Sequence, residues 1–370
     1  MKHLHENIVK TERALCVGLS LKSGNREYDF DSLNELKSLA KSAGADVVDI
    51  ILQVRESATP KYFIGKGLAY EIAGNIVESN VDTVIFDNEL TAVQVRNLEA
   101  ILNCKVIGRT ELILDIFALR AKTKIAKLQV ELAQLEFIRP RLRRAWTHLS
   151  RIQGGIGFRG PGETQLETDK RLISKRISRI KKDLVKTKKH IDNTHKSRKN
   201  EFLVALVGYT NAGKSTLMKS LSGEKMFVKN MLFSTLDSTT RKIYINDTCS
   251  VLLSDTVGFI RKLPHQLVES FRSTLSEVLE ADLLVHVVDI SKEDVINQIQ
   301  SVNQVLEEID ARDKNIIHVF NKIDLLQDHI TKKRFSVYSN SVFVSAKDKK
   351  GLDDLKDKIK FFFTGNKIKN

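Results

Sequence analysis

The sequence predicts an α/β fold in which two parallel-sheet domains flank a helical segment. Short apolar runs rich in β-branched residues alternate with amphipathic runs in the first and last thirds of the chain. This alternation is typical of parallel sheets covered by helices. Between the two regions, apolar residues recur at helical spacing instead. We therefore expect an N-terminal α/β domain over 1–120, a helical hairpin over 121–200 and a second α/β domain over 201–366.

The N-terminal domain is predicted from four buried runs and three amphipathic ones. Each buried run is short and continuously apolar, as in strands that are covered on both faces. The predicted strands are Ala14–Leu19, Val47–Val54, Thr83–Phe86 and Lys105–Ile107, and the predicted helices are 31–43, 67–79 and 91–102.

Two heptad-like stripes predict the helical segment. The two apolar stripes can bury each other if the helices pack as an antiparallel hairpin. Pro140 should end or kink the first helix. The first stripe is Ile125, Leu128, Leu132 and Leu135, and the second is Leu166, Ile173, Ile177, Ile180, Leu184 and Ile191.

The net charge of +14 is concentrated in this segment. Residues 139–200 hold 19 Lys and Arg against 5 Asp and Glu, so the remainder of the chain is neutral. A solvated helix face is one interpretation of such a run. A basic arm that binds nucleic acid is the other, because concentrated like charges repel unless an anionic partner neutralises them.

A glycine-rich segment joins the two predicted helices. Five of the nine residues from Gly154 to Gly162 are glycine, which is more than a helical turn requires. Such a tip could press its backbone against an anionic surface. The candidate RNA-binding residues are Gly154, Gly155, Gly157, Phe158, Arg159 and Gly160.

The composition excludes other classes of protein. No run approaches the roughly 18 uninterrupted apolar residues of a membrane span, and Met1–Lys10 does not resemble a signal peptide. Cys16, Cys104 and Cys249 have neither disulfide nor metal-ligand spacing. We expect a cytoplasmic protein, because a reducing compartment suits free thiols.

The second α/β domain contains a phosphate-binding motif. Its predicted strands are 202–207, 241–246, 250–255, 283–290, 315–320 and 341–344, and its predicted helices lie near 214–222, 264–280, 294–312 and 351–363. Gly208–Ser215 matches G-x-x-x-x-G-K-[ST] between a strand and a helix. In this context backbone N–H groups cradle phosphates, Lys214 reaches the β- and γ-phosphates and Ser215 binds Mg²⁺.

A second motif predicts that the base is guanine. Asn321–Asp324 follows an apolar strand, and the Asp324 carboxylate can accept from both N1–H and the N2 amine of guanine. Adenine offers no such pair of donors and would leave the carboxylate buried and unpaired. Ser345–Lys347 is expected to contact the guanine carbonyl through its backbone.

Two further segments should respond to the γ-phosphate. Asp255–Gly258 follows a strand, so Asp255 is placed to hold Mg²⁺ through water and the Gly258 N–H to bond the γ-phosphate. A threonine should complete the Mg²⁺ shell, and the residues alone leave three candidates, Thr235, Thr239 and Thr240.

The residue after Gly258 is Phe259, where Ras-like GTPases place a glutamine that orients water. Phenylalanine cannot do this, so we expect slow intrinsic turnover or a catalytic group from a partner. Lys214 and Gly258 are then the catalytic candidates, and no side-chain base is identified. Asn211 is either a K⁺ ligand that replaces an arginine finger or a residue that simply caps the loop.

Together these residues resemble the HflX family of translational GTPases. Beyond the nucleotide motifs, the resemblance rests on Tyr62–Gly67, Arg109–Phe117, Ala126–Leu132 and Gly154–Asp169. It implies an HflX-type N-terminal domain, a helical hairpin and a Ras-like P-loop G domain. It also implies binding to the large (50S) ribosomal subunit and its rRNA, with a role in rescuing or splitting stalled ribosomes.

The resemblance assigns Phe233–Asp237 to the first switch and makes Thr235 the second Mg²⁺ ligand beside Ser215. Ser238 and Gly108 depart from the residues usual in the family. The predicted nucleotide-contacting residues are Gly208, Tyr209, Thr210, Asn211, Ala212, Gly213, Lys214, Ser215, Phe233, Ser234, Thr235, Leu236, Asp237, Asp255, Thr256, Val257, Gly258, Asn321, Lys322, Ile323, Asp324, Ser345, Ala346 and Lys347.

The predicted activity is Mg²⁺-dependent hydrolysis of GTP to GDP, stimulated by the ribosome. GTP and GDP are the expected ligands, and K⁺ is a further expected cofactor if Asn211 binds it. We expect a monomer without DNA sequence specificity. The alternative is a GTP-regulated RNA-binding or ribosome-assembly factor in which hydrolysis only times release. A signalling switch would explain the second α/β domain but not the basic arm.

Overall fold

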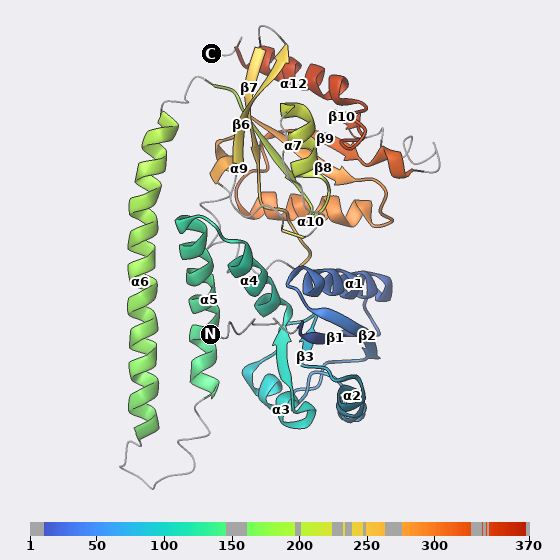
Figure 1. Cartoon of the computed structure of the whole chain (residues 1–370), viewed down its shortest axis with the longest axis vertical. Coiled ribbons are helices and arrows are strands. Elements are labelled where there is room, and N and C mark those ends of the chain that lie inside the picture. Colours follow the sequence, from blue (N-terminus) through green and yellow to red (C-terminus); the bar gives the residue numbers. More distant parts are fainter. Residues whose placement is uncertain are drawn as a thin grey trace, which may run out of the picture. The chain divides into compact units, whose positions relative to one another are not determined.

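The computed structural model has a mixed α/β architecture with two parallel-sheet regions, as predicted (Figure 1). The chain forms two compact units, of which the first holds Met1–Leu119 and Gln134–Ile177 and the second holds Arg120–Ala133 and Ser178–Asn370. The structure describes residues 11–145, 161–196, 201–223, 232–233, 239–246, 249–262, 276–326, 335, 338 and 340–367.

The first sheet consists of four parallel strands, and each lies where an apolar run predicts it. The strands are β1 (Arg13–Leu21), β2 (Asp46–Arg55), β3 (Thr83–Phe86) and β4 (Lys105–Gly108). Their order is β2-β1-β3-β4. The connecting helices are α1 (Arg26–Ser42), α2 (Lys66–Ser79) and α3 (Ala92–Leu102), which confirm the three predicted ones, and α4 (Arg109–Arg120) follows. Apolar residues on most sides of α4 hide its periodicity, since seven of its residues are buried.

The helical segment forms two long helices, α5 (Lys124–Ala145) and α6 (Pro161–Lys196). Pro140 lies inside α5, so it does not end the helix, and the predicted alternative, a kink at this residue, stays a prediction. Ile177 and Ile180 on the predicted stripe of α6 are buried. The glycine-rich residues 154–160 lie outside the described residues, and the hairpin and the three-part division of the chain stay predictions.

The buried surface of α5 extends beyond the predicted seam. Leu132 on that seam is buried, whereas Leu128 and Leu135 are only partly buried. A second set of buried residues, at spacings of three and four, lies on another side of the helix because a full turn takes 3.6 residues. This set is Ala126, Gln129, Val130, Ala133 and Phe137. No described helix is long and apolar enough to cross a bilayer.

The second sheet has six strands with β5 near its centre. The strands are β5 (Leu203–Gly208), β6 (Thr239–Asn246), β7 (Cys249–Asp255), β8 (Leu283–Asp289), β9 (Asn315–Asn321) and β10 (Ser341–Phe343). Their order is β10-β9-β8-β5-β7-β6, and only β6 is antiparallel to its neighbour. The helices are α7 (Lys214–Ser222), α9 (Ser276–Glu280), α10 (Val295–Glu308) and α12 (Leu352–Lys367). Of the helix predicted over 264–280, the structure describes only α9.

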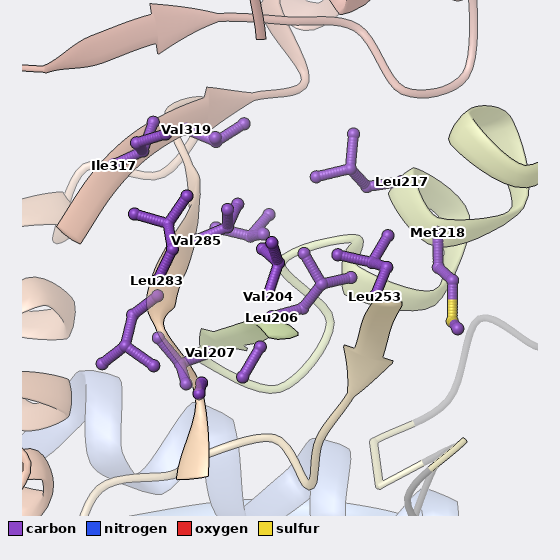
Figure 2. Packing of buried hydrophobic residues seen from close by; sticks show 14 of the residues in the cluster. Val204, Leu206, Val207, Leu217, Met218, Leu253, Leu283, Val285, Ile317 and Val319 are labelled. Atoms are coloured by element: carbon purple, nitrogen blue, oxygen red, sulfur yellow. The ribbon is translucent and has the colours of Figure 1, made fainter. Parts of the chain in front are cut away.

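The core of this sheet surrounds β5. Val204, Leu206 and Val207 on β5 are fully buried, and Leu217 and Met218 of α7 belong to the same cluster (Figure 2). Successive side chains along β5, which point to opposite faces of the sheet, are nearly all buried. Strands β7 and β8 pair with its two edges, and helices cover its faces. The central strand therefore holds its C-terminal loop on a rigid base.

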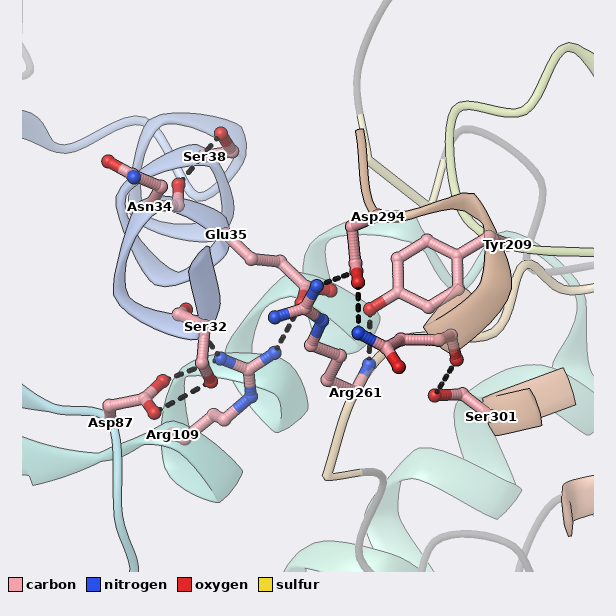
Figure 3. Close-up of polar contacts among 11 residues, drawn as sticks. Ser32, Asn34, Glu35, Ser38, Asp87, Arg109, Tyr209, Arg261, Asp294 and Ser301 are labelled. Atoms are coloured by element: carbon pink, nitrogen blue, oxygen red, sulfur yellow. Dashed lines mark hydrogen bonds and ion pairs between the residues drawn. The ribbon is translucent and has the colours of Figure 1, made fainter. Parts of the chain in front are cut away.

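A buried ion network lies at the C-terminal edge of the first sheet. Arg109, the first residue of α4, is 2% exposed and pairs with Asp87 at 2.7 Å and with Glu35 at 3.1 Å (Figure 3). The Ser32 hydroxyl donates to Asp87 at 2.8 Å, and Arg109 donates to the Ser32 carbonyl at 3.2 Å. The guanidinium therefore links α1, the end of β3 and the start of α4.

Replacing Arg109 with Met should destabilise the N-terminal sheet by about 3–5 kcal/mol, because Asp87 and Glu35 would keep buried charges without their cation. Urea-dependent hydrogen exchange of the β1 and β3 amides measures this loss. Arg96→Met, at an exposed position of α3, is the matched control. Equal protection in the two variants would contradict the structural role of Arg109.

Candidate nucleotide-binding site

Gly208–Ser215 forms a tight loop between β5 and α7. Gly208 has φ +146°, and a Cβ there would lie 2.2 Å from the Val287 carbonyl oxygen. Gly213 has φ +97°, and a Cβ there would lie 2.3 Å from the Asn321 Nδ2. Both positions require glycine for conformation and for space. The loop thus keeps its backbone N–H groups near the N-terminus of α7, where anions bind favourably.

Lys214 lies inside this loop. Its Nζ donates to the carbonyl oxygens of Gly208 at 3.0 Å and Tyr209 at 2.9 Å. Burial lowers the pKa of Lys214 to about 8, and the nearby Asp255 carboxylate raises it. The ammonium group is therefore held in place and lacks full hydration, so an anionic phosphate would be a favourable partner.

Ser215 and Asp255 bring two oxygen groups together at the start of α7 and the end of β7. The Ser215 hydroxyl donates to Asp255 Oδ2 at 2.6 Å. The next residue, Thr256, donates its hydroxyl to the Leu206 carbonyl at 2.6 Å, which ties this turn to β5. Hydroxyl and carboxylate oxygens are hard ligands of the kind that Mg²⁺ prefers.

The segment that follows Asp255 packs against the loop. A Cβ on Gly258 would lie 2.9 Å from Lys214 Nζ and 2.8 Å from Thr210 Cγ2, so only glycine fits here. Phe259 is buried in the core cluster instead of reaching into the site. A side chain so placed cannot orient an attacking water, which agrees with the expectation for this position.

Asn321 joins three loops of the site. Its Nδ2 donates to the Ala212 carbonyl at 2.9 Å, and its Oδ1 accepts from the Ala346 N–H at 3.0 Å. The Ser220 hydroxyl of α7 also donates to the Ala346 carbonyl, at 2.5 Å. The two predicted motifs that follow β9 and β10 are thus held against the phosphate loop.

Asp324 and Lys322 have different partners in the loop after β9. The Ser345 hydroxyl donates to Asp324 Oδ1 at 2.7 Å, and the Asp348 N–H donates to the Ser345 hydroxyl at 3.1 Å. Lys322 adopts φ +67° and pairs with Asp289 at 2.7 Å. The Asp324 carboxylate is therefore oriented by a hydroxyl, in a loop that an ion pair fixes.

Several predicted residues are not described. The structure places Phe233, which is buried with φ +54°, but Ser234, Thr235, Leu236 and Asp237 lie outside the described residues. Thr239 and Thr240, the other two Mg²⁺ candidates, begin β6 opposite Asp255 and Ser254.

Asn211 adopts a left-handed conformation, with φ +62°, and its side chain is exposed. Asparagine tolerates this conformation better than most residues. The capping role of Asn211 and its role as a K⁺ ligand both stay predictions.

Sequence analysis did not single out Arg261, Asp289 or Asp294. Arg261 forms an ion pair with Asp294, and its backbone N–H donates to the Tyr209 hydroxyl at 2.6 Å. No spacing rule links these residues, because strand order brings them together. The only signal in the sequence is an arginine shortly after Gly258.

The donor set fits a nucleotide with Mg²⁺. The Gly208–Ser215 loop is too tight to hold a Cβ at either of its glycines. The buried Lys214 ammonium lies within this loop, and the Ser215 hydroxyl contacts the Asp255 carboxylate beside it. Predicted residues from Gly208–Ser215, Asp255–Gly258, Asn321–Asp324 and Ser345–Lys347 meet at the C-terminal ends of the parallel strands of this sheet. Open α/β sheets bind ligands at this edge.

Three family models match consecutive parts of the chain. A family described as "GTP-binding GTPase N-terminal" matches residues 30–118, and "GTP-binding GTPase Middle Region" matches residues 120–198. A family described as "50S ribosome-binding GTPase" matches residues 203–322. The site described above lies largely within the third match.

Curated relatives and a solved structure agree with these matches. GTPase HflX of Flavobacterium psychrophilum is 43% identical over 96% of this chain and 91% of the relative. GTPase HflX of Escherichia coli K12 is 48% identical over 82% of this chain and 72% of the relative. A crystal structure described as SsGBP in complex with GDP is similar, with a TM-score of 0.53 and 27% identity over 95% of this chain and 99% of that chain. The chain therefore belongs to the HflX family of GTPases.

Proposed function

We propose that the site binds GTP as its Mg²⁺ complex and that each motif contacts one part of the nucleotide. Lys214 contacts the β- and γ-phosphates, and the Gly258 N–H contacts the γ-phosphate. Ser215 and Thr235 hold Mg²⁺, with Asp255 acting through water. When bound, Mg²⁺ would stabilise negative charge on the phosphate oxygens. The buried Lys214 and the 2.6 Å Ser215–Asp255 contact support this assignment.

Base recognition follows from the loops after β9 and β10. Asp324 accepts from the two guanine donors, and Ser345 orients the carboxylate through its hydroxyl. The backbone of Ser345–Lys347 contacts the guanine carbonyl. Asn321 supports both loops through its amide and is a positioning residue rather than a reader of the base.

Hydrolysis needs a group that the described residues do not supply. Phe259 is buried in the core, so no side chain at this position can orient water. The missing group then comes from the binding partner, from K⁺ held by Asn211, or from both. This arrangement gives slow turnover in isolation and fast turnover on the partner.

The partner is the 50S subunit, through its rRNA. The family description "50S ribosome-binding GTPase" supports this choice, and so does the charge pattern of α6. Arg171, Lys175, Arg179, Lys182 and Lys186 are all exposed. At 3.6 residues per turn they fall within an arc of about 80°, over roughly 22 Å of helix.

This set of five residues, the α6 ridge, lies opposite the buried side of the helix. Ile177 and Ile180 are buried on the other side, so the cations point away from the packed surface. A row of cations on a rigid helix suits a row of phosphates, which phosphate-backbone binding requires. The glycine-rich segment Gly154–Gly160 is proposed as a second site of rRNA contact on the basis of its sequence.

The function that fits these features best is splitting or rescue of stalled ribosomes in the cytoplasm, by a protein that acts as a monomer. The alternative is an RNA-binding or ribosome-assembly factor in which hydrolysis only times release. The nature of the activating RNA separates these functions, since rescue requires intact subunits.

Purified 50S subunits should raise GTP hydrolysis by about 100-fold or more, the contribution of one positioned catalytic group. The rate is measured with and without subunits, in K⁺ and then in Na⁺ buffer, with naked rRNA as the comparison. A K⁺ requirement would assign the cation role to Asn211. Equal stimulation by naked rRNA would favour the assembly factor, and no stimulation would reject the ribosomal partner.

Replacing Asp324 with Asn should lower GDP affinity by about two orders of magnitude or more, because the amide cannot accept from both guanine donors. Affinity for xanthosine diphosphate should rise, since its C2 carbonyl can accept from the amide. Competition binding of the two nucleotides measures the change. Asp313→Asn, at an exposed position before β9, is the control. An unchanged preference for GDP would mean that another residue recognises the base.

Replacing Lys175, Lys182 and Lys186 with Gln should weaken 50S binding and reduce its salt dependence. Each lost phosphate contact lowers the slope of log K against log salt by about 0.7–0.9, so the slope should fall by about two to three. Binding is measured by co-sedimentation at several salt concentrations.

The control carries the same charge change away from the α6 ridge. Lys41 on α1, Lys105 on β4 and Lys292 in the loop before α10 are exposed, and their replacement with Gln should leave most of the slope intact. Equal losses in the two triple variants would show that only net charge matters.

A further inference from the structure

The backbone that follows Gly258 is fastened directly to the phosphate loop. The Phe259 N–H donates to the Gly208 carbonyl at 3.1 Å, and the Phe259 carbonyl accepts from the Thr210 N–H at 2.7 Å. Tyr209 and Phe259 thereby form a parallel bridge beyond the ends of β5 and β7. Gly258 is held immediately before this bridge, where a Cβ would lie 2.9 Å from Lys214 Nζ.

The Tyr209 hydroxyl adds a further contact between the phosphate loop and the segment after Gly258. The Tyr209 hydroxyl accepts from the Arg261 backbone N–H at 2.6 Å, and Tyr209 itself belongs to the core cluster (Figure 3). The second residue of a G-x-x-x-x-G-K-[ST] loop is not specified by the motif. The phenol therefore does something that phosphate binding alone does not require.

The Arg261 side chain holds the same segment from the other direction. Its guanidinium pairs with Asp294, and the two side chains are 5% and 12% exposed. Asp294 is the N-cap residue of α10 but makes no capping bond with the helix backbone. The carboxylate accepts from the side-chain amide of Asn297 in the first turn of α10 and also pairs with Arg261, and the ion pair lies largely out of water.

We propose that Tyr209, Arg261 and Asp294 are positioning residues that preset the Gly258 N–H for the γ-phosphate of GTP. The tyrosine hydroxyl and the Arg261–Asp294 pair fix the segment on either side of Phe259. These contacts do not supply the water-orienting side chain that Phe259 lacks; they act on the position of the Gly258 backbone alone. This inference rests on the assignment of Gly258 to the γ-phosphate under the proposed function.

The proposal predicts that loosening this segment lowers the affinity for GTP but not the affinity for GDP. GDP has no γ-phosphate, so its affinity depends on Lys214 and the loop but not on the Gly258 N–H. Loosening the segment should therefore change the ratio of the two affinities. A purely structural role for Tyr209 would lower both affinities together.

The test is Tyr209→Phe, which keeps the buried ring and removes only the hydroxyl. Affinities for GDP and for a non-hydrolysable GTP analogue are measured by fluorescence competition. The GTP-analogue affinity should fall about three- to tenfold, the worth of one hydrogen bond, and the GDP affinity should change less than about twofold. Hydrogen exchange at the Arg261 amide should also become faster in the GDP complex.

Tyr244→Phe is the matched control, because it removes a hydroxyl from a side chain that is 70% exposed on β6. It should leave both affinities and the Arg261 amide unchanged. Asp294→Asn removes the charge that holds Arg261 and should reproduce the selective loss of GTP-analogue binding. Parallel losses of GDP and GTP-analogue affinity in Tyr209→Phe, or no loss at all, would overturn the proposal.

The Gly258→Ala variant tests the γ-phosphate assignment of Gly258 independently of the positioning role of Tyr209. The added Cβ would collide with Thr210 and approach Lys214, so the GTP-analogue affinity should fall more than in Tyr209→Phe. If Gly258→Ala is selective and Tyr209→Phe is not, the positioning role is wrong and the γ-phosphate assignment stands. If Gly258→Ala does not affect GTP-analogue binding selectively, the γ-phosphate assignment itself fails.

Discussion

The nucleotide site depends on one buried amide, the side chain of Asn321. It donates to the phosphate loop at Ala212 and accepts from the loop after β10 at Ala346. A carboxamide can do both because it carries a donor and an acceptor in one plane. Loss of either bond would leave a buried polar group unpaired, which costs more than the bond itself contributes. Asn321 thus joins the phosphate loop to the loop that is proposed to contact the base.

After Gly258, backbone contacts hold the segment in place, and the following residue offers no polar side chain to the site. The position that usually carries a polar group for water is occupied by Phe259, whose ring joins the core. Its backbone pairs with the phosphate loop, and Tyr209 and Arg261 extend that pairing. The segment is therefore ordered without offering a catalytic group of its own. A protein built in this way is suited to control by whatever surface completes the site.

Basic residues occupy two different environments in this protein, the exposed surface of α6 and the buried network around Arg109. Cations on α6 are exposed, and a polyanionic partner of the proposed kind would relieve their mutual repulsion. Arg109 is the opposite case, because it is buried among Asp87, Glu35 and Ser32 and holds α1, β3 and α4 together. The two kinds of arginine cannot be told apart by composition. Burial and partners distinguish them.

The sequence by itself determined the α/β class, nearly all described strands and the motifs that meet at the second sheet. These features depend on local periodicity and on glycines such as Gly208 and Gly213, whose conformation and close contacts few other residues allow. Only the tertiary structure decided that α5 continues through Pro140 and buries a second side. It also decided that Arg261 pairs with Asp294 and that Asn321 links two loops. Such contacts join strand ends that are distant in sequence, and strand order, which no local pattern encodes, brings them together.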